Sequence, residues 1–281
     1  MKILVINGAR KAGNTVEVVR YFEQMFKKES EKDGKLTFDF EHLYLSDHHI
    51  DFCIGCHQCI FYGEDKCPHA LKVKEIEEKI LLADAIVLAS PGYMFSVTGI
   101  MKNFLDHVAY NCHRPKYFGK RAFLISSCTK WQTKGVFIPM ETWASAAGFN
   151  VVDKVYVDIL PFPMSKVELD KRRTKLEKAA HSFYKAMIRP STLKPKFGEI
   201  FVFHVFRVIC KIAPQILQAD LRYYEEKDAF NKDTKWYVPA QVSSFKHHMA
   251  NFLEKKMRNT ISKMVDYEKL LTVEKGFRNK L

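Results

Sequence analysis

Short apolar runs alternate along the first part of the chain with segments in which apolar positions recur every three or four residues. The runs predict buried β-strands, and the recurring positions predict helices with one apolar face. We expect five strands, at Ile3–Ile6, Leu36–Phe40, Ala85–Ala89, Arg121–Ile125 and Val151–Ile159. We expect helices around Val18–Phe26 and Val73–Ile80 and over residues 97–110, 136–147 and 165–189. This alternation predicts a doubly wound α/β domain with a parallel sheet.

The pattern changes after Pro190, where a polar linker begins. Residues 197–218 and 242–265 then show helical spacing, and no further strand is indicated. We therefore predict one domain over residues 1–189 and a helical C-terminal extension over residues 190–281.

The first helix of the extension, over residues 197–218, has one narrow polar stripe, made by His204, Arg207, Lys211, Gln215 and Gln218. Pro214 should kink this helix or end it early. Its apolar surface has three interpretations. It is core or a homodimer interface, it covers the active site of a partner subunit, or it makes a peripheral membrane contact in which Arg207 and Lys211 meet lipid headgroups.

The composition is that of a globular protein, with 47% hydrophobic and 27% charged residues in a chain of 281. The first residues read as a strand rather than a signal peptide, so we expect a cytoplasmic protein. The net charge of +13 would attract anionic partners, but no nucleic-acid-binding motif accompanies it. We interpret the charge as a solvated basic surface and expect no nucleic acid as partner.

Four of the seven cysteines follow the spacing C-x2-C-x2-C-x7-C, at Cys53, Cys56, Cys59 and Cys67. In a reducing compartment such thiols bind metals or do redox work rather than form structural disulfides. The spacing suits an iron–sulfur cluster better than zinc, whose ligands usually come as two separated pairs. Spacing alone leaves a cluster, a disulfide switch and a packed loop open.

A second candidate site joins the first strand to the first helix, in the segment Asn7-Gly8-Ala9-Arg10-Lys11-Ala12-Gly13-Asn14-Thr15. Doubly wound folds bind ligands at the carboxyl ends of their strands, where a helix N-terminus offers unpaired N–H groups to a phosphate. The segment matches neither G-x-G-x-x-G nor a Walker loop, which argues against a Rossmann dinucleotide site and an NTPase. A capped turn without a ligand is the alternative.

This loop resembles the FMN phosphate loop of the flavodoxin-like NADPH-dependent FMN reductase superfamily, G-S-x-R-x-x-G-N-T, with Ala9 in place of the serine. The resemblance implies a phosphate site made by Gly8, Ala9, Arg10, Gly13, Asn14 and Thr15. Residues 83–107 are similar to the family's A-D-x-I-x-x-x-S-P-x-Y-x-x-S-V-x-G-x-x-K-x-F-x-D segment, in which a loop wraps the isoalloxazine ring. That loop is here Pro91, Gly92, Tyr93, Met94, Phe95, Ser96 and Val97. Residues 126–131, with Ser127, should make a third contact.

The cysteines have a counterpart in the same superfamily. Iron–sulfur flavoproteins carry C-x2-C-x2-C and a fourth cysteine shortly after it, and these cysteines hold a [4Fe–4S] cluster beside FMN. The resemblance therefore implies Cys53, Cys56, Cys59 and Cys67 as cluster ligands. Other flavodoxin-like reductases share a similar segment without a cluster, so a redox-sensitive or packed loop stays open.

The resemblance covers about residues 1–160 and implies a flavodoxin-like fold with a five-stranded parallel sheet. It also implies an enzyme that passes hydride from NADH or NADPH through FMN to a quinone, a flavin or another small acceptor. We further expect a homodimer. One alternative is an iron–sulfur flavoprotein that exchanges electrons with a ferredoxin-like partner, and another is a non-enzymatic flavin and thiol redox sensor. Hydride transfer through flavin needs no protein acid or base at its first step, so no catalytic residue is predicted.

Overall fold

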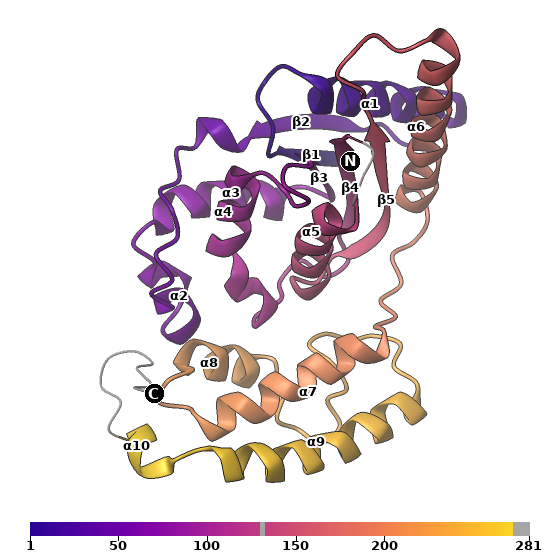
Figure 1. The fold of residues 1–281 in the computed structure, drawn as a ribbon. Helices are drawn as coiled ribbons and strands as arrows, with labels where there is room; N and C mark the ends of the chain where they lie inside the picture. Colours follow the sequence, from indigo (N-terminus) through magenta and orange to yellow (C-terminus); the bar gives the residue numbers. More distant parts are fainter. Residues whose placement is uncertain (130–132, 272–281) are drawn as a thin grey trace. The chain divides into compact units, whose positions relative to one another are not determined.

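The computed structural model describes residues 1–129 and 133–271, which form two compact units (Figure 1). The α/β unit is made of three segments, Met1–Cys53, Leu71–Ala109 and Tyr117–Ser191. The helical unit is made of Ile54–Ala70, Tyr110–Lys116 and the chain from Thr192 onward. The sequence predicted one division after residue 189. The helical unit differs from that prediction because it also takes in two segments from the first half of the chain.

The α/β unit contains a five-stranded sheet in the order β2-β1-β3-β4-β5, with every neighbouring pair parallel. The strands are β1 (Lys2–Asn7), β2 (Asp39–Tyr44), β3 (Ala85–Pro91), β4 (Arg121–Cys128) and β5 (Asn150–Asp158). Along the chain, β2 is added on one side of β1 and β3 on the other, so the order of the strands switches sides at β1. The crevice beyond the carboxyl ends of β1 and β3 is therefore the expected ligand site of the fold. The predicted flavodoxin-like doubly wound fold is confirmed.

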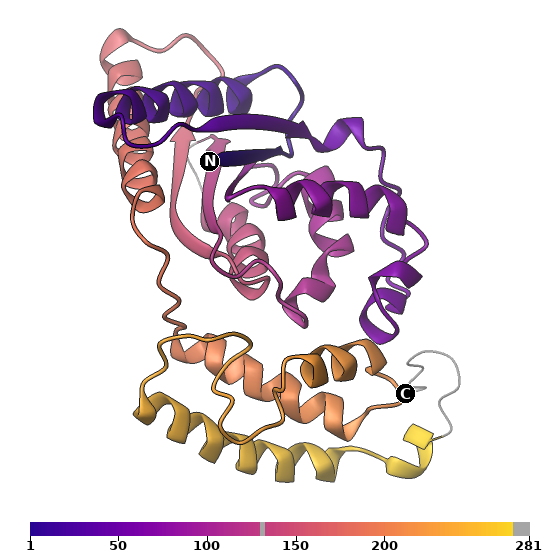
Figure 2. The same ribbon diagram turned by 180° about the vertical axis from the view of Figure 1, so that it is seen from behind.

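Helices cover both faces of the sheet (Figures 1 and 2). One layer holds α1 (Asn14–Asp33) and α6 (Lys166–Met187), and the other holds α3 (Ala70–Leu82), α4 (Gly99–His107) and α5 (Lys134–Ala146). Phe22 of α1 packs against Phe123 of β4 with ring centroids 4.9 Å apart, and Phe183 of α6 joins the same core. The predicted apolar faces of these helices therefore do lie against the sheet.

The second strand begins later than the alternation of apolar residues predicted. Leu36 is 39% exposed and lies outside β2, which starts at Asp39. The reason is the length of β1, because Lys2, its first residue, pairs with Asp39.

The helix predicted over residues 97–110 is divided in the structure. Thr98 caps α4, which ends at His107, and a 3-10 turn (Ala109–Cys112) follows.

The helical unit consists of short and long helices without a strand among its described residues. They are α2 (Gln58–Phe61), α7 (Phe197–Ile212), α8 (Gln218–Glu226), α9 (Ser244–Met264) and α10 (Tyr267–Leu271). The helix α7 ends before Pro214, as the sequence predicted. Within the described residues no helix is both long and apolar enough to span a bilayer.

Two residues of the polar stripe, His204 and Arg207, face α9 rather than solvent, whereas Lys211, Gln215 and Gln218 are exposed. Arg207 is 8% exposed, and its Nε atom donates to Glu254 Oε2 of α9 at 2.9 Å. His204 is fully buried, with its Nδ1 atom 2.5 Å from the same carboxylate oxygen. A buried charge is stable only when it is paired. The interpretation in which Arg207 meets lipid headgroups is therefore wrong, because this side chain is part of the core between the two helices.

Candidate functional site

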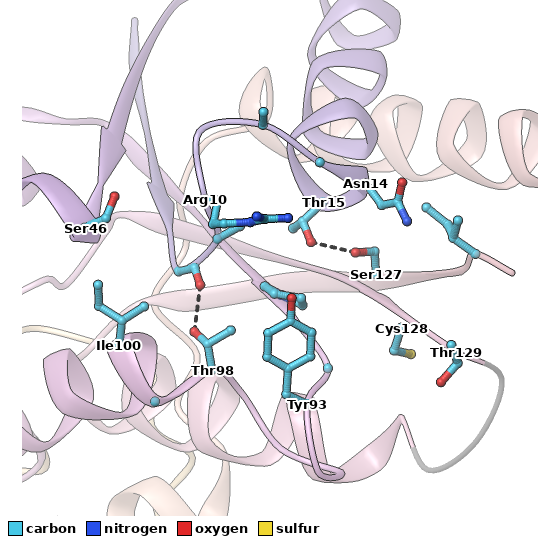
Figure 3. Close-up of a pocket in the computed structure, with 18 residues that line it drawn as sticks. Arg10, Asn14, Thr15, Ser46, Tyr93, Thr98, Ile100, Ser127, Cys128 and Thr129 are labelled. Atoms are coloured by element: carbon cyan, nitrogen blue, oxygen red, sulfur yellow. Dashed lines mark hydrogen bonds between the residues drawn. The ribbon is translucent and has the colours of Figure 1, made fainter. Parts of the chain in front are cut away.

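A cavity of about 720 Å³ opens at the carboxyl ends of β1, β3 and β4 (Figure 3). Its predicted lining residues are Gly8, Ala9, Arg10, Gly13, Asn14, Thr15, Pro91, Gly92, Tyr93 and Ser127. The structure thus brings the loops after three different strands to one cavity. Met94, Phe95, Ser96 and Val97 were predicted with them but are not among the lining residues.

The loop after β1 is shaped for close approach of a ligand to its backbone. Gly13 is the N-cap of α1, with φ +124°, and no side chain caps this end of the helix. The first turn therefore keeps donors that an anion can use, and the helix dipole favours negative charge there. Arg10 adds a cationic side chain to the same wall of the cavity. These features fit a phosphate group.

Two buried hydroxyl contacts fix the loop relative to the rest of the site (Figure 3). Thr98 Oγ1 donates to the carbonyl oxygen of Gly8 at 2.7 Å. Thr15 Oγ1 and Ser127 Oγ, on the other side of the cavity, are 2.6 Å apart. A Cβ atom on Gly8 would lie 2.7 Å from Met101 Cβ, so only glycine fits between the loop and α4. The cavity is consequently held open by contacts within the protein.

The loop after β3 contains a tight turn over Tyr93–Ser96. The two end residues exchange backbone hydrogen bonds of 3.0 Å, and Met94 and Phe95 both have positive φ, at 45° and 60°. Such backbone is costly for residues other than glycine and is common at functional sites. The turn leaves Met94 90% exposed and Tyr93 62% exposed beside the cavity. A large apolar surface therefore lies next to the opening.

The same turn is packed against the start of α5. A Cβ atom on Gly135 would lie 1.8 Å from the carbonyl oxygen of Phe95, which no side chain could tolerate. A Cβ atom on Gly92 would lie 2.8 Å from Cys128 Cβ. Two glycines thus permit the loop after β3 to lie close to α5 and β4.

Cys128 and Thr129, from the loop predicted as a third contact, also line the cavity. Several further lining residues were not predicted from the sequence, namely Ala12, Ser46, Thr98, Gly99, Ile100 and Ile159. The sequence did contain a signal for Thr98, because a threonine that precedes a glycine and an apolar helix is a typical helix N-cap. Burial, followed by the nearby Asp158 carboxylate, raises the pKa of the Cys128 thiol. This thiol therefore stays protonated at neutral pH and is a poor nucleophile. Two residues of the loop predicted as a third contact, Lys130 and Trp131, lie outside the described residues.

The four predicted metal ligands fall in both units of the chain. Cys53 belongs to the α/β unit, where its backbone N–H donates to Asn103 Oδ1 at 3.0 Å. Cys56, Cys59 and Cys67 belong to the helical unit. Over residues 1–129 and 133–271, no three His, Cys, Asp or Glu side chains lie together as a metal would require. The cluster stays a prediction.

Residues 1–159 match the family of NADPH-dependent FMN reductases. Among curated relatives, an iron–sulfur flavoprotein of Archaeoglobus fulgidus is 33% identical over 116 residues, 41% of this chain and 49% of the relative. An FMN-dependent NADH:quinone oxidoreductase of Mesoplasma florum is 25% identical over 163 residues, 57% of this chain and 65% of the relative. The chain spans about half the length of the iron–sulfur flavoproteins it matches.

A flavone reductase of known structure resembles this chain with a TM-score of 0.50 and 17% sequence identity. The similarity covers 66% of this chain and 62% of the flavone reductase. At this level of identity the likeness concerns the fold, and it agrees with the strand order of the α/β unit.

Proposed function

Because the chain belongs to the NADPH-dependent FMN reductase family, we propose that it is an FMN-dependent oxidoreductase that uses NADH or NADPH as electron donor. The acceptor in this proposal is a small molecule such as a quinone or a flavin. The observation that carries it is the cavity at the carboxyl ends of β1, β3 and β4, which combines an anion site with an apolar opening. Cavities of this size and mixed lining suit cofactors.

The residues present fit FMN at both ends of the cavity. The uncapped first turn of α1, with Gly13, Thr15 and Arg10, would hold the phosphate. The loop from Pro91 to Tyr93 would supply the apolar wall for the ring. When bound, the flavin supplies hydride-transfer chemistry between a reduced nicotinamide and an acceptor. No acid or base from the protein is assigned to that step.

The protein's contribution in this proposal is binding and orientation. The Thr98–Gly8 and Thr15–Ser127 hydrogen bonds keep the loops around the cavity in place before a ligand arrives. Preorganised contacts reduce the entropy lost on binding. The exposed apolar turn beside the opening favours a planar, apolar acceptor that can pack against Tyr93 and Met94.

The proposal is tested by mixing the FMN-loaded protein with NADPH or NADH under anaerobic conditions. We expect the flavin absorbance to bleach with at least one of the two nucleotides and to return when a quinone is added. Protein that binds FMN but is not reduced by either nucleotide would contradict the reductase assignment. Sedimentation of the same sample tests the homodimer, which also remains a proposal.

A second candidate function is electron transfer through an iron–sulfur cluster to a protein partner. The relatives named iron–sulfur flavoproteins and the C-x2-C-x2-C-x7-C spacing favour it. Iron and sulfide analysis of anaerobically purified protein separates the two functions, since stoichiometric iron would favour the cluster and iron-free protein would rule against it.

A further inference from the structure

Two arginines bind the end of the short helix that carries Cys59. Arg114 donates from Nη2 to the carbonyl oxygen of Cys59 at 2.6 Å and from Nη1 to that of Ile60 at 3.2 Å. Arg222 donates from Nη2 to the carbonyl oxygen of Tyr62 at 2.7 Å. The last carbonyl groups of a helix have no partner within it, so they need donors from elsewhere. Here the guanidinium groups of Arg114 and Arg222, which belong to the same unit as the short helix, provide these donors.

Arg114 is in turn held by a buried carboxylate. Asp220 of α8 is fully buried and accepts a hydrogen bond from Arg114 Nη1. His113 Nδ1 lies 2.8 Å from its other oxygen, and Glu64 Oε2 lies 3.3 Å from Arg114 Nη2. Arg114 is itself only 6% exposed. Charge-assisted contacts of this kind are short, directional and strong when buried.

Apolar packing contributes little to holding this part of the chain. In residues 54–70, all of which the structure describes, Phe61 is the only buried hydrophobic side chain. Ile54, at the start of the segment, is 70% exposed. Polar contacts therefore contribute to the position of the segment. A planar guanidinium with several donors in a fixed geometry is well suited to that task.

We propose that Arg114 and Asp220 are positioning residues for the cysteine segment, defined as residues 54–70. Asp220 orients the guanidinium, the guanidinium fixes the backbone of Cys59, and the accessibility of the thiols in the segment follows from that placement. Residues of the helical unit thus hold the cysteine segment in place within that unit. This role concerns the segment alone and does not depend on whether the protein reduces a flavin or binds a metal.

The test measures thiol alkylation, cysteine by cysteine, in the full-length protein. Reduced and chelator-treated protein is reacted with iodoacetamide, and the modification of each cysteine is followed by mass spectrometry. We expect Asp220→Asn and Arg114→Lys to raise the alkylation rate of Cys59 about tenfold, the scale set by losing one hydrogen bond to a charged group. Cys128, in the α/β unit, should keep its wild-type rate and serves as the internal control.

A matched control variant is Arg258→Lys, because Arg258 is an exposed arginine of the helical unit whose Nη2 lies 3.0 Å from Glu254. We expect wild-type rates from it. A lysine at position 114 keeps the charge but cannot reach two carbonyl groups and Asp220 together. Wild-type rates in folded Arg114→Lys would therefore overturn the proposal.

A global loss of structure gives a different result from a released segment. If Asp220→Asn raised the rates of Cys59 and Cys128 equally, the pair would be a stability element and the proposal would fail. If that variant does not fold, Arg222→Lys provides the test, because it removes only the contact to Tyr62 and leaves the Arg114–Asp220 pair intact. We expect it to raise the Cys59 alkylation rate by a smaller factor, and an unchanged rate would count against the positioning of the cysteine segment by its arginine contacts.

Discussion

Replacing Thr98 by valine should loosen the loop that follows β1. The Thr98 hydroxyl donates to the carbonyl oxygen of Gly8 at 2.7 Å and accepts from the backbone N–H of Met101 at 3.3 Å, as the N-cap of α4. The side chain is 7% exposed, and valine has nearly the same shape. The substitution therefore removes two hydrogen bonds and little else. It leaves a buried carbonyl group and a helix N-terminus without their partner.

The cost follows from these two contacts. An unsatisfied buried acceptor costs about 1 to 3 kcal/mol, and loss of an N-cap costs about 1 kcal/mol. We expect Thr98→Val to lower the free energy of unfolding by about 2 to 4 kcal/mol. Since Gly8 lies in the proposed phosphate loop, we also expect the Kd for FMN to rise about tenfold, or about 1.4 kcal/mol.

The assays are urea unfolding followed by circular dichroism and FMN titration followed by quenching of flavin fluorescence. Thr98→Ser is the matched control, because serine keeps the hydroxyl and loses one methyl group, worth about 0.8 kcal/mol. It should bind FMN like the wild type. A Thr98→Val protein that lost stability but kept the wild-type Kd would refute the link between Thr98 and the loop.

Two further substitutions test the packing of the loop after β3 against α5 and the buried ion pair between α7 and α9. Gly135→Ala should raise the Kd for FMN at least tenfold in the same titration, because the new Cβ would lie 1.8 Å from the Phe95 carbonyl oxygen and must displace the loop; an unchanged Kd would contradict this packing. Glu254→Gln should cost about 3 kcal/mol in urea unfolding, since it leaves Arg207 buried without its counter-charge. Burial acts to raise the pKa of Glu254, but hydrogen bonds from His204 and Arg207 lower it to about 2. Stability from this carboxylate should thus be present above about pH 4.5 and be lost as pH falls toward 2, whereas Glu254→Gln should lack that acid-dependent loss.

Local periodicity was sufficient to predict the α/β unit. Strands such as Ile3–Ile6 and Ala85–Ala89 are covered on both faces, so they appear as unbroken apolar runs. The loop after β1 was found because glycines and a helix start follow that strand, and the loop after β3 was found from its resemblance to the family's flavin-binding segment. These signals lie within a few residues of each other in the chain.

What the sequence did not show depends on residues far apart in the chain. The sequence left the environment of Arg207 open between core, subunit interface and lipid headgroups, because its partner, Glu254, comes 47 residues later in another helix. The proposed positioning of residues 54–70 depends on Arg114 and on its partner Asp220. Asp220 lies 106 residues after Arg114 in the chain. Spacing along the sequence cannot show such pairings, since each is created only when the helices pack.

The proposed FMN-dependent oxidoreductase function is tested most directly by an FMN titration of the purified full-length chain, combined with an anaerobic absorbance spectrum after addition of NADPH or NADH. We expect a yellow protein that binds FMN stoichiometrically and whose flavin band bleaches with a nicotinamide. A folded, colourless protein that does not take up FMN would contradict it.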